Sequence, residues 1–297
     1  MPRDKVQTYL RWVGGKRRIA SRLRRFVPYD YAGRRYHEPF LGAASLFLAL
    51  RPARAYLSDL NEALIGSFQH VRARPDLIAR YLSKHAESNS RDHYYKVRDQ
   101  YNRTRRFSSA QAARFIYLNR TCYNGVFRVN REGRFNVPYG KRDRFLFPSR
   151  TDLVRVSHAL KDAKFRTRSY ERSLEEAKEG DFVYLDPPYP PLNGTSYFRH
   201  YTADRFSSVD QENLARMTKE LRKRGCLVMV SNADTAQIRD LYSGLSMASL
   251  PVTRSVTCKS VRHTVSELVI TTYEEAEMLG ASRDASAAAR QNEAEEG

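Results

Sequence analysis

Short apolar runs that end in polar residues alternate with a helix-forming stretch in the N-terminal part of the chain. A strand-like run at 35–40 leads into Gly42, and the residues that follow, 43–50, form a helical pattern. A second strand-like run, at 55–59, ends in an acid, Asp59. A strand, a glycine turn, a helix and a strand in this order predict the start of a doubly wound α/β sheet.

The strand pattern returns in the C-terminal half. Apolar runs at 182–185 and 226–231 predict buried strands, and they are followed by Asp186 and Asn232. A run at 267–273 predicts a last strand. Polar residues at the carboxyl ends of neighbouring strands line the ligand crevice of an open α/β sheet, so we expect the functional site there.

The middle of the chain, 61–149, has a different composition. It contains helical patterns and then a stretch, 119–144, that is dense in Arg, Asn, Gly, Tyr and Phe. This composition suits an insertion that contacts DNA better than the core of a sheet. Helices are predicted over 62–71, 76–85, 110–117 and 207–224. The last of these opens with a capping-box pattern, in which Ser207 is followed by Asp210.

These differences predict three parts. Residues 1–60 and 150–280 are expected to form a core, and 61–149 a separate recognition domain inserted into it. The last stretch, 281–297, is rich in Ala, Ser and Glu and has no large apolar residue, so we expect a disordered tail.

The charge of the chain indicates a class of partner. The 297 residues include 52 Lys and Arg against 33 Asp and Glu, which gives a formal net charge of +19 and a pI near 10.0. Such a surplus indicates a polyanionic partner, first of all nucleic acid, although a solvated basic surface would have the same composition. The shares of hydrophobic residues, 41%, and charged residues, 29%, exclude wholesale disorder.

Several classes of protein are excluded by what the sequence lacks. No apolar run approaches the ~20 residues of a membrane span, and 1–18 has no apolar signal-peptide core. Cys122, Cys226 and Cys258 are scattered without CxxC spacing, and the seven histidines show no metal-ligand spacing. We therefore expect a cytoplasmic protein with reduced thiols, no membrane contact and no bound metal.

The segment Asp186-Pro187-Pro188-Tyr189 directly follows a predicted buried strand. The two prolines lack N–H donors and hold the backbone extended, so their carbonyls can accept hydrogen bonds from a ligand. A carboxylate, a carbonyl and an aromatic ring within four residues can hold a planar group that carries an NH2. The plainer interpretation is a proline-rich strand exit with a hydrogen-bonded aspartate.

Two glycine-containing segments are further candidates for ligand contact. Gly42 lies in a strand-to-helix turn, where the missing side chain lets a ligand approach the backbone, and Asp59 follows seventeen residues later. An acid at about this spacing holds a ribose hydroxyl in nucleotide-binding folds. Near the N-terminus, a Gly-Gly-Lys run at 14–16 follows the only tryptophan, Trp12, and can approach an anion, although a packed basic turn would look the same.

Several segments have to be considered together with these. In chain order they are Trp-Val-Gly-Gly-Lys at 12–16, Glu-Pro-Phe-Leu-Gly at 38–42, Ser-Asp-Leu-Asn at 58–61, Leu-Asn-Arg-Thr-Cys-Tyr-Asn-Gly-Val at 118–126, Arg-Phe-Asn-Val-Pro-Tyr-Gly at 134–140, Asp-Pro-Pro-Tyr at 186–189, Val-Ser-Asn-Ala-Asp-Thr at 230–235 and Ser-Glu-Leu at 266–268. In this order the sequence resembles the Dam-type DNA adenine-N6 methyltransferases, over roughly residues 8–273.

The resemblance implies a fold and a cofactor. The implied fold is a Rossmann-like α/β methyltransferase core that uses S-adenosylmethionine, with a mostly helical DNA-recognition insertion that contains a β-hairpin loop. The residues implied to line the cofactor site, with Asp59 on the ribose, are Trp12, Lys16, Phe40, Gly42, Asp59 and Asp186. The family usually has a second glycine where this chain has Ala44, a change that adds one methyl group close to the cofactor.

The resemblance also implies an activity, which is methyl transfer to N6 of an adenine flipped out of duplex DNA. In the catalytic segment, Asp186 and the carbonyl of Pro187, which Pro188 follows, accept the two hydrogens of the amine, and Tyr189 stacks on the base. The positions that match the family's DNA-reading residues, with GATC as the expected target, are Arg11, Tyr123, Asn124, Val126, Arg128 and Pro138. The family usually has Lys and Leu where Arg11 and Val126 stand.

The implied partner is double-stranded DNA, bound by a cytoplasmic monomer in a bacterial host, cellular or phage-encoded. Two alternatives stay open: an RNA adenine-N6 methyltransferase, and a non-catalytic DNA-binding protein that keeps the fold. The resemblance of 123–138 to a duplex reader argues against the first, and the intact Asp59, Asp186 and Tyr189 argue against the second. For any single arginine, a phosphate contact is the plainer alternative to base reading.

Overall fold

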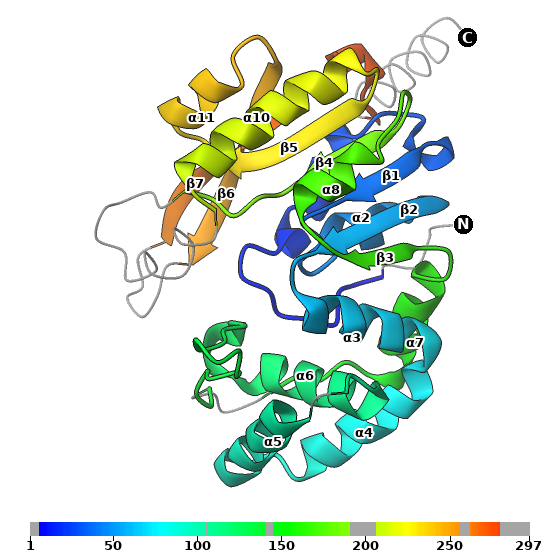
Figure 1. Cartoon of the computed structure of the whole chain (residues 1–297), viewed down its shortest axis with the longest axis vertical. Helices are drawn as coiled ribbons and strands as arrows, with labels where there is room; N and C mark the ends of the chain where they lie inside the picture. Colours follow the sequence, from blue (N-terminus) through cyan, green and yellow to red (C-terminus); the bar gives the residue numbers. More distant parts are fainter. Residues whose placement is uncertain (1–5, 105, 141–144, 191–205, 256–261, 280–297) are drawn as a thin grey trace, which may run out of the picture. The chain divides into compact units, whose positions relative to one another are not determined.

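The computed structural model describes residues 6–104, 106–140, 145–190, 206–255 and 262–279, and it contains a mixed seven-stranded sheet (Figure 1). The strands are β1 Arg35–Glu38, β2 Arg54–Asp59, β3 Lys164–Thr167, β4 Phe182–Leu185, β5 Leu227–Ala233, β6 Ser246–Ser255 and β7 Arg262–Thr271. Their order in the sheet is β3-β2-β1-β4-β5-β7-β6. β4 pairs in parallel with both β1 and β5, whereas β7 is antiparallel to both β5 and β6. The predicted α/β sheet is present, and an antiparallel hairpin forms one of its edges.

The order of the strands reverses between β1 and β4. In an open α/β sheet, ligands bind at such a point, beside the carboxyl ends of the strands. β1 ends at Glu38, and β4 ends at Leu185, directly before Asp186. Because β1 and β4 run parallel, Glu38 and Asp186 lie at the same edge of the sheet.

Polar residues fix where most of the longer helices begin. The α-helices are α1 Ala20–Leu23, α2 Ser45–Leu50, α3 Glu62–Ala73, α4 Pro75–Glu87, α5 Arg91–Arg103, α6 Ser109–Thr121, α7 Arg150–Ala159, α8 Tyr170–Glu175, α10 Ser208–Lys223 and α11 Ala236–Leu241. The side chains that accept an N-terminal backbone N–H of α3, α5, α6, α7, α10 and α11 belong to Asn61, Ser90, Ser108, Ser149, Ser207 and Thr235. Ser207 and Asp210 form the predicted capping box. Each such cap contributes about 1 kcal/mol of stability.

The chain divides into two compact units. The first unit consists of Met1–Arg18, Leu41–Arg51 and Leu57–Ser169, and the second of Ile19–Phe40, Pro52–Tyr56 and Tyr170–Gly297. The predicted insertion, 61–149, belongs to the first unit, together with parts of the chain on both sides of it. The predicted domain boundaries stay a prediction.

Helices α8, α10 and α11 of the second unit cover one face of its strands (Figure 1). Their apolar side chains pack on alternate residues of β4 and β5, among them Val183, Leu185, Val228 and Val230, which are fully buried. Burial of a Val or Leu side chain contributes about 1.5–3 kcal/mol. The apolar runs at 182–185 and 226–231 form central strands, and the helices that pack on β4 and β5 remove their side chains from water.

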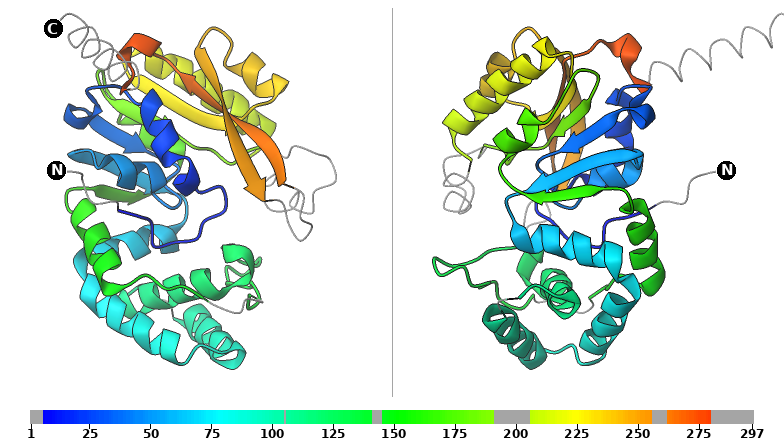
Figure 2. Two further views of the ribbon diagram at one scale, coloured as in Figure 1. Left: turned by 180° about the vertical axis from the view of Figure 1, so that it is seen from behind. Right: turned by 45° about the vertical axis from the view of Figure 1, so that its right-hand side comes forward.

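Helices α3 to α7 of the first unit pack against one another (Figure 2). Two residues of α5 hold a segment that follows α6. The Tyr94 hydroxyl donates to the carbonyl of Val137 at 2.8 Å. The side chain of Asn102 donates to the carbonyl of Phe135 at 3.0 Å and accepts from its N–H at 2.8 Å. The helices thus act as a support for the segment 122–140.

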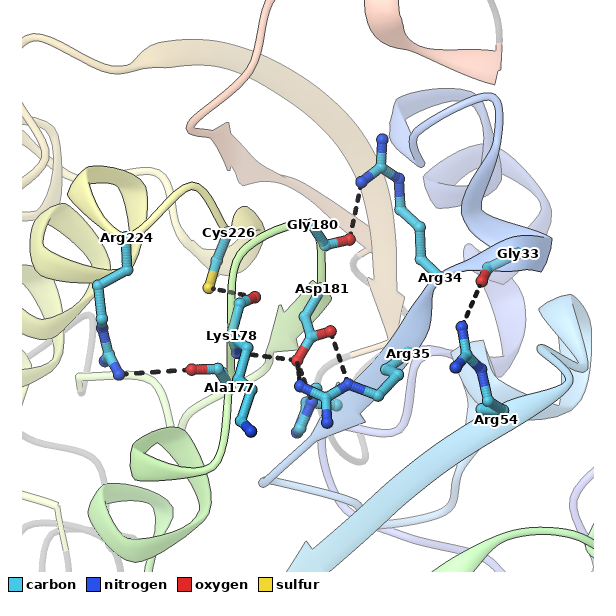
Figure 3. Close-up of polar contacts among 11 residues, drawn as sticks. Gly33, Arg34, Arg35, Arg54, Ala177, Lys178, Gly180, Asp181, Arg224 and Cys226 are labelled. Carbon is cyan, nitrogen blue, oxygen red and sulfur yellow. Dashed lines mark hydrogen bonds and ion pairs between the residues drawn. The ribbon is translucent and has the colours of Figure 1, made fainter.

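Hydrogen bonds and an ion pair connect the residues at the amino ends of β1 and β4 (Figure 3). Asp181 accepts two hydrogen bonds from the Arg35 guanidinium, at 2.8 and 2.6 Å, and one from His37 at 2.9 Å. Burial alone would raise the pKa of Asp181, but the hydrogen bonds from His37 and Arg35 outweigh it and lower the pKa. The carbonyls of Gly180, Gly33 and Ala177 accept from Arg34, Arg54 and Arg224. The arginines at this edge of the sheet therefore serve the fold.

The predicted elements are present, and the differences have local causes. β4 has the predicted bounds, whereas α2 begins two residues later than predicted because Ala44 has φ 54°, in the left-handed region. The last predicted strand begins earlier, at Arg262, because it pairs along its length with β6. The sequence patterns did not predict β3, β6, α1, α5, α7, α8 or α11. The predicted tail, 281–297, lies outside the described residues.

Candidate active site

The Asp-Pro-Pro-Tyr segment leaves β4 at the point where the strand order reverses. Its residues differ in exposure, since Pro187 is buried and Pro188 is exposed. The carbonyl of Pro188 accepts a hydrogen bond from Gln211 Nε2 at 2.9 Å. The Oε1 of Gln211 in turn accepts from Asn232 Nδ2 at 3.0 Å, and both amide side chains are buried. Two side-chain amides, one on α10 and one on β5, therefore fix the backbone of this segment.

A second anchor holds the tyrosine at the end of the segment. The hydroxyl of Tyr189 donates to the carboxylate of Glu267 on β7. Glu267 is 2% exposed and pairs with Ala233, the last residue of β5. Burial raises the pKa of Tyr189 well above its ordinary value, and the nearby carboxylates of Asp186 and Glu267 raise it further. Tyr189 therefore keeps its phenolic proton at any physiological pH.

Two further buried tyrosines lie at the same edge of the sheet. The Tyr36 hydroxyl donates to Glu38 at 2.8 Å, and the Tyr184 hydroxyl shares a hydrogen bond of 3.0 Å with Ser231. Burial raises the pKa of both tyrosines well above the ordinary value, and the carboxylate of Asp186 adds to the effect. Tyr36 and Tyr184 are therefore neutral at physiological pH, and each hydroxyl has a hydrogen-bond partner.

Phe40, which is predicted to line the cofactor site, lies in an aromatic cluster of the second unit. Its ring stacks on Tyr170, with centroids 5.2 Å apart, and meets Phe206 edge-on at 5.7 Å. Asn213 donates to the Tyr170 hydroxyl at 2.9 Å, which fixes the stacked ring. These contacts between rings hold the Phe40 side chain in place beside the carboxyl end of β1.

The first unit brings together Gly42 and Asp59, as the spacing predicts. The N–H of Gly42 donates to one carboxylate oxygen of Asp59 at 3.1 Å, and the N–H of Asn61 donates to the other at 2.9 Å. Burial raises the pKa of Asp59, while these backbone donors and that of Leu60 oppose the rise. The backbone bonds hold the carboxylate at the end of β2 in one orientation.

Trp12 packs against the same turn. A Cβ atom built at Gly42, which has φ 46°, would lie 3.1 Å from Cδ1 of the indole. The ring of Trp12 stacks on Phe127, with centroids 6.1 Å apart. Lys16 is 5% exposed, and its Nζ donates to the carbonyl of Gly14 at 3.1 Å. Trp12, Gly42 and Asp59 thus form one constellation.

Ala44, where the family usually has glycine, has φ 54° and is fully buried. A residue with a side chain in the left-handed region is strained by roughly 1–2 kcal/mol. The backbone around Ala44 is nevertheless satisfied, since its N–H donates to Leu41 at 2.7 Å and its carbonyl accepts from Leu48 at 3.0 Å. The backbone angle at Ala44 is one that glycine adopts without strain.

The segment 122–140 of the first unit turns back on itself as an irregular hairpin. Bridges join Cys122 to Tyr139 and Val129 to Phe135. Three of the residues predicted to read DNA, Tyr123, Asn124 and Pro138, are exposed on it. Val126 is partly buried between them.

Arg128 and Arg11 are the two arginines predicted to read bases, and both are partly buried. The Nε of Arg128 donates to Asn136 Oδ1 at 2.7 Å across the hairpin. Arg11 lies against the turn Tyr123–Gly125, and a Cβ built at Gly125 would be 2.8 Å from the Cβ of Arg11. The structure therefore brings Arg11 together with the hairpin, from which it is more than a hundred residues distant in the sequence.

Two supporting residues were missed by the sequence analysis. Gln211 follows the capping box of α10 by one position, and no local pattern distinguishes it from other polar helix residues. Glu267 belongs to the Ser-Glu-Leu segment that resembles the family, but an acid in an apolar run gives no sign of its partner. A buried glutamate within a strand pattern is the one signal that could have been used, because such a carboxylate needs a donor.

Known proteins similar in sequence identify the class. The chain matches the family described as D12 class N6 adenine-specific DNA methyltransferase over residues 12–256. The Type II methyltransferase M1.LlaDCHI of Lactococcus lactis subsp. cremoris is 33% identical over 274 residues, which cover 90% of this chain and 96% of that protein. M.MjaIII, a Type II methyltransferase of Methanocaldococcus jannaschii, is 35% identical over 287 residues, with coverages of 90% and 99%. The DNA adenine methylase of Escherichia coli (strain K12) is 34% identical over 269 residues, with coverages of 89% and 95%.

The fold and the site define an α/β protein with an acid and a fixed aromatic residue at the switch point of its sheet. The chain belongs to the D12 class of N6 adenine-specific DNA methyltransferases. It is thus an adenine-specific DNA methyltransferase, and the predicted family is confirmed. No helix in the described ranges is long and apolar enough to cross a bilayer.

Proposed function

We propose that the protein transfers a methyl group from S-adenosylmethionine to N6 of a flipped adenine in duplex DNA, within the sequence GATC. The observation that carries the proposal is the anchored Asp-Pro-Pro-Tyr segment. It leaves the central strand β4 at the switch point of the sheet, with the Pro188 carbonyl and the Tyr189 hydroxyl each held by a buried partner.

The residues present fit a ligand that carries a nucleoside. Gly42 has no side chain at the turn after β1, so the indole of Trp12 can pack directly against the backbone beside Asp59. The carboxylate of Asp59 is oriented by backbone donors, which suits it to accept hydrogen bonds from ribose hydroxyls. The residues proposed to hold the cofactor are Trp12, Lys16, Phe40, Gly42, Asp59 and Asp186. When bound, S-adenosylmethionine supplies a methyl group activated by the positive charge of a sulfonium.

The reaction requires a better nucleophile than free adenine. The lone pair of N6 is delocalised into the ring, so the amine attacks poorly. Asp186 and the carbonyl of Pro187 accept its two hydrogens, and this localises the lone pair on nitrogen. Positioned acceptors of this kind act through orientation and electrostatics. After transfer the nitrogen carries one proton too many, and the carboxylate of Asp186 is the nearest base proposed to take it.

The target base has to leave the duplex, which costs about a few kcal/mol. Tyr189 stacks on the extruded ring, and the bond to Glu267 keeps its own ring from turning. Pro188 fixes the direction in which Tyr189 leaves the segment. The neutral hydroxyl of Tyr189 adds no charge beside the methyl donor.

The segment 61–149, together with Arg11, is proposed to recognise the DNA. Arg11 and Arg128 pair with guanine O6 and N7, and Val126 and Pro138 contact a thymine methyl. Tyr123 enters the stack that the adenine leaves, with Asn124 beside it. The exposure of the hairpin residues supports this assignment.

A radiolabelled methyl-transfer assay on unmethylated duplex DNA and on RNA tests the proposal. We expect label on DNA only, and Asp186→Ala should abolish transfer while DNA binding stays intact. Asp240→Ala, an exposed acid on α11, is the control and should keep wild-type activity. Near-normal turnover of Asp186→Ala would remove the mechanism, label on RNA would favour an RNA methyltransferase, and no label would favour a non-catalytic protein.

A further inference from the structure

A buried asparagine of α6 joins two of the segments that the proposed function assigns to target reading. Asn119 is 2% exposed, and its Oδ1 accepts the N–H of Arg11 at 2.8 Å. Its Nδ2 donates to the carbonyl of Arg11 at 2.6 Å and to the carbonyl of Gly125 at 3.3 Å. The orientation of the amide is fixed by these partners, since an N–H has to meet the oxygen and the two carbonyls have to meet the nitrogen.

The two bonds to Arg11 replace those that a neighbouring strand would make. Each backbone group of Arg11 is engaged by one side of the same amide, so the main chain can neither rotate nor slide past α6. The third bond reaches the turn Tyr123–Gly125, which precedes Val126 in the hairpin. Asn119 therefore fixes the position of Arg11 relative to the turn.

Close packing reinforces this link. Gly125 has φ 67°, and a Cβ there would come within 2.8 Å of the Arg11 Cβ, so the turn needs glycine for both conformation and space. The N–H of Tyr123 donates to the carbonyl of Pro138 at 2.9 Å, which ties the turn to the returning strand of the hairpin. Arg11 and the hairpin thus form one unit, with Asn119 at its centre.

Base reading depends strongly on position. A bidentate arginine–guanine contact needs two donors at hydrogen-bond distance together, and such a contact discriminates between base pairs by on the order of 5- to 150-fold. Asn119 is buried and cannot reach DNA itself, and the residues of the Asp-Pro-Pro-Tyr segment belong to the second unit. A change at Asn119 should therefore act on discrimination through Arg11.

We propose that Asn119 is a positioning residue that sets target specificity, because it holds the main chain of Arg11 in register with the turn Tyr123–Gly125. This inference rests on the proposed function of Arg11 as a base-reading residue. It assigns Asn119 no role in the methyl-transfer step.

The test begins from the target sequence, which is read from the DNA of a methylation-free host that expresses the wild-type chain. Synthetic duplexes with this site and with each single base-pair change are then methylated with radiolabelled S-adenosylmethionine, and kcat/KM is compared between them. Arg11→Ala identifies the base pair that Arg11 reads. Asn119→Asp keeps the acceptor for the Arg11 N–H but sets a carboxylate oxygen against two carbonyls. Gly125→Ala pushes the turn away from Arg11 and leaves Asn119 intact.

Thr272→Val is the matched control, because it also removes a side-chain polar group that hydrogen-bonds to two backbone groups. Thr272 Oγ1 accepts from the N–H of Val228 at 2.9 Å and donates to the carbonyl of Cys226 at 3.3 Å, in the second unit. Thermal unfolding shows which variants are folded. If Asn119→Asp does not fold, the outcome for Gly125→Ala decides.

We expect Asn119→Asp and Gly125→Ala to lower discrimination at the Arg11 base pair by about tenfold, within the range of one bidentate contact. The kcat on the cognate duplex should stay within about threefold of the wild-type value, because Asn119 has no role in the methyl-transfer step. Thr272→Val should leave discrimination unchanged. In an Arg11→Ala background, Asn119→Asp should add no further loss at that base pair.

The inference is overturned if Asn119→Asp discriminates like the wild type, loses discrimination equally at all base pairs, or adds a further loss to Arg11→Ala. It is also overturned if Arg11→Ala changes discrimination nowhere, because Arg11 is then a phosphate contact. In all these cases the wild type still methylates DNA. A wild type without any methyl transfer to DNA would instead refute the proposed function, and with it this inference.

Discussion

Replacing Gln211 by alanine tests whether the Asp-Pro-Pro-Tyr segment is held by the amides behind it. The change removes the 2.9 Å bond to the Pro188 carbonyl and the 3.0 Å bond from Asn232. The Asn232 amide is fully buried, and leaving such a group without its partner costs about 1–3 kcal/mol. Pro188 is exposed, so water can replace the donor at its carbonyl, and that loss is about 0.5–1.5 kcal/mol. We expect the free energy of unfolding to fall by about 1.5–4.5 kcal/mol in total.

The effect on catalysis should exceed what stability alone explains. A segment that shifts by a fraction of an ångström misplaces both the Pro187 carbonyl and Tyr189, and we expect the rate of methyl transfer to fall by about 10- to 100-fold. The assay is single-turnover transfer of radiolabel with saturating cofactor and DNA, below the unfolding temperature of the variant. Thr218→Val is the control, since Thr218 is buried on the same helix and its hydroxyl donates to the carbonyl of Leu214 within that helix, at 2.9 Å. A Gln211→Ala rate within twofold of the wild type would refute the reasoning.

Two other predictions concern single acids. Asp59→Ala should raise the Kd of S-adenosylmethionine at least about tenfold, as expected for a lost charged hydrogen bond, and leave the rate at saturation within about threefold. Quenching of the fluorescence of Trp12, the only tryptophan, measures binding. An unchanged Kd would contradict the role of Asp59. Asp181→Asn should make the free energy of unfolding depend less on pH in the acid range. Hydrogen bonds from His37 and Arg35 lower the pKa of Asp181 in the folded state. The stability that Asp181 contributes is therefore present above its unfolded pKa near 3.8 and is lost as the pH falls further. Urea unfolding between pH 7 and 3 measures this, and parallel curves for variant and wild type would count against it.

The elements that the sequence predicts well are those whose burial is uniform. The run at 182–185 forms β4 with the predicted bounds, because every side chain in it is buried and no polar residue interrupts it. Ser207 and Asp210 fix the start of α10 through contacts three residues apart, which a local pattern contains. The strand β6 was not predicted, because Ser246–Ser255 mixes apolar and polar residues and becomes a strand through its pairing with β7.

The same distinction applies to the site. The predicted neighbours Gly42 and Asp59 are joined by a hydrogen bond, since the turn after β1 and the end of β2 are fixed by one strand-helix-strand unit. The link between Asn119 and Arg11 spans 108 residues, and that between Tyr189 and Glu267 spans 78. Contacts of this kind depend on how helices and strands pack, and no periodicity or spacing in the sequence contains them.

The central claim is that this chain places one methyl group on adenine N6 through Asp186. The most direct measurement is sequencing of modified bases in the DNA of a methylation-free host that expresses either the wild type or Asp186→Ala. We predict N6-methyladenine at GATC with the wild type and none with the variant. Methylation at a different sequence would be consistent with methyl transfer to adenine N6 but would refute the assignment of the DNA-reading residues. Absence of N6-methyladenine with the wild type, or equal methylation by both proteins, would contradict the claim.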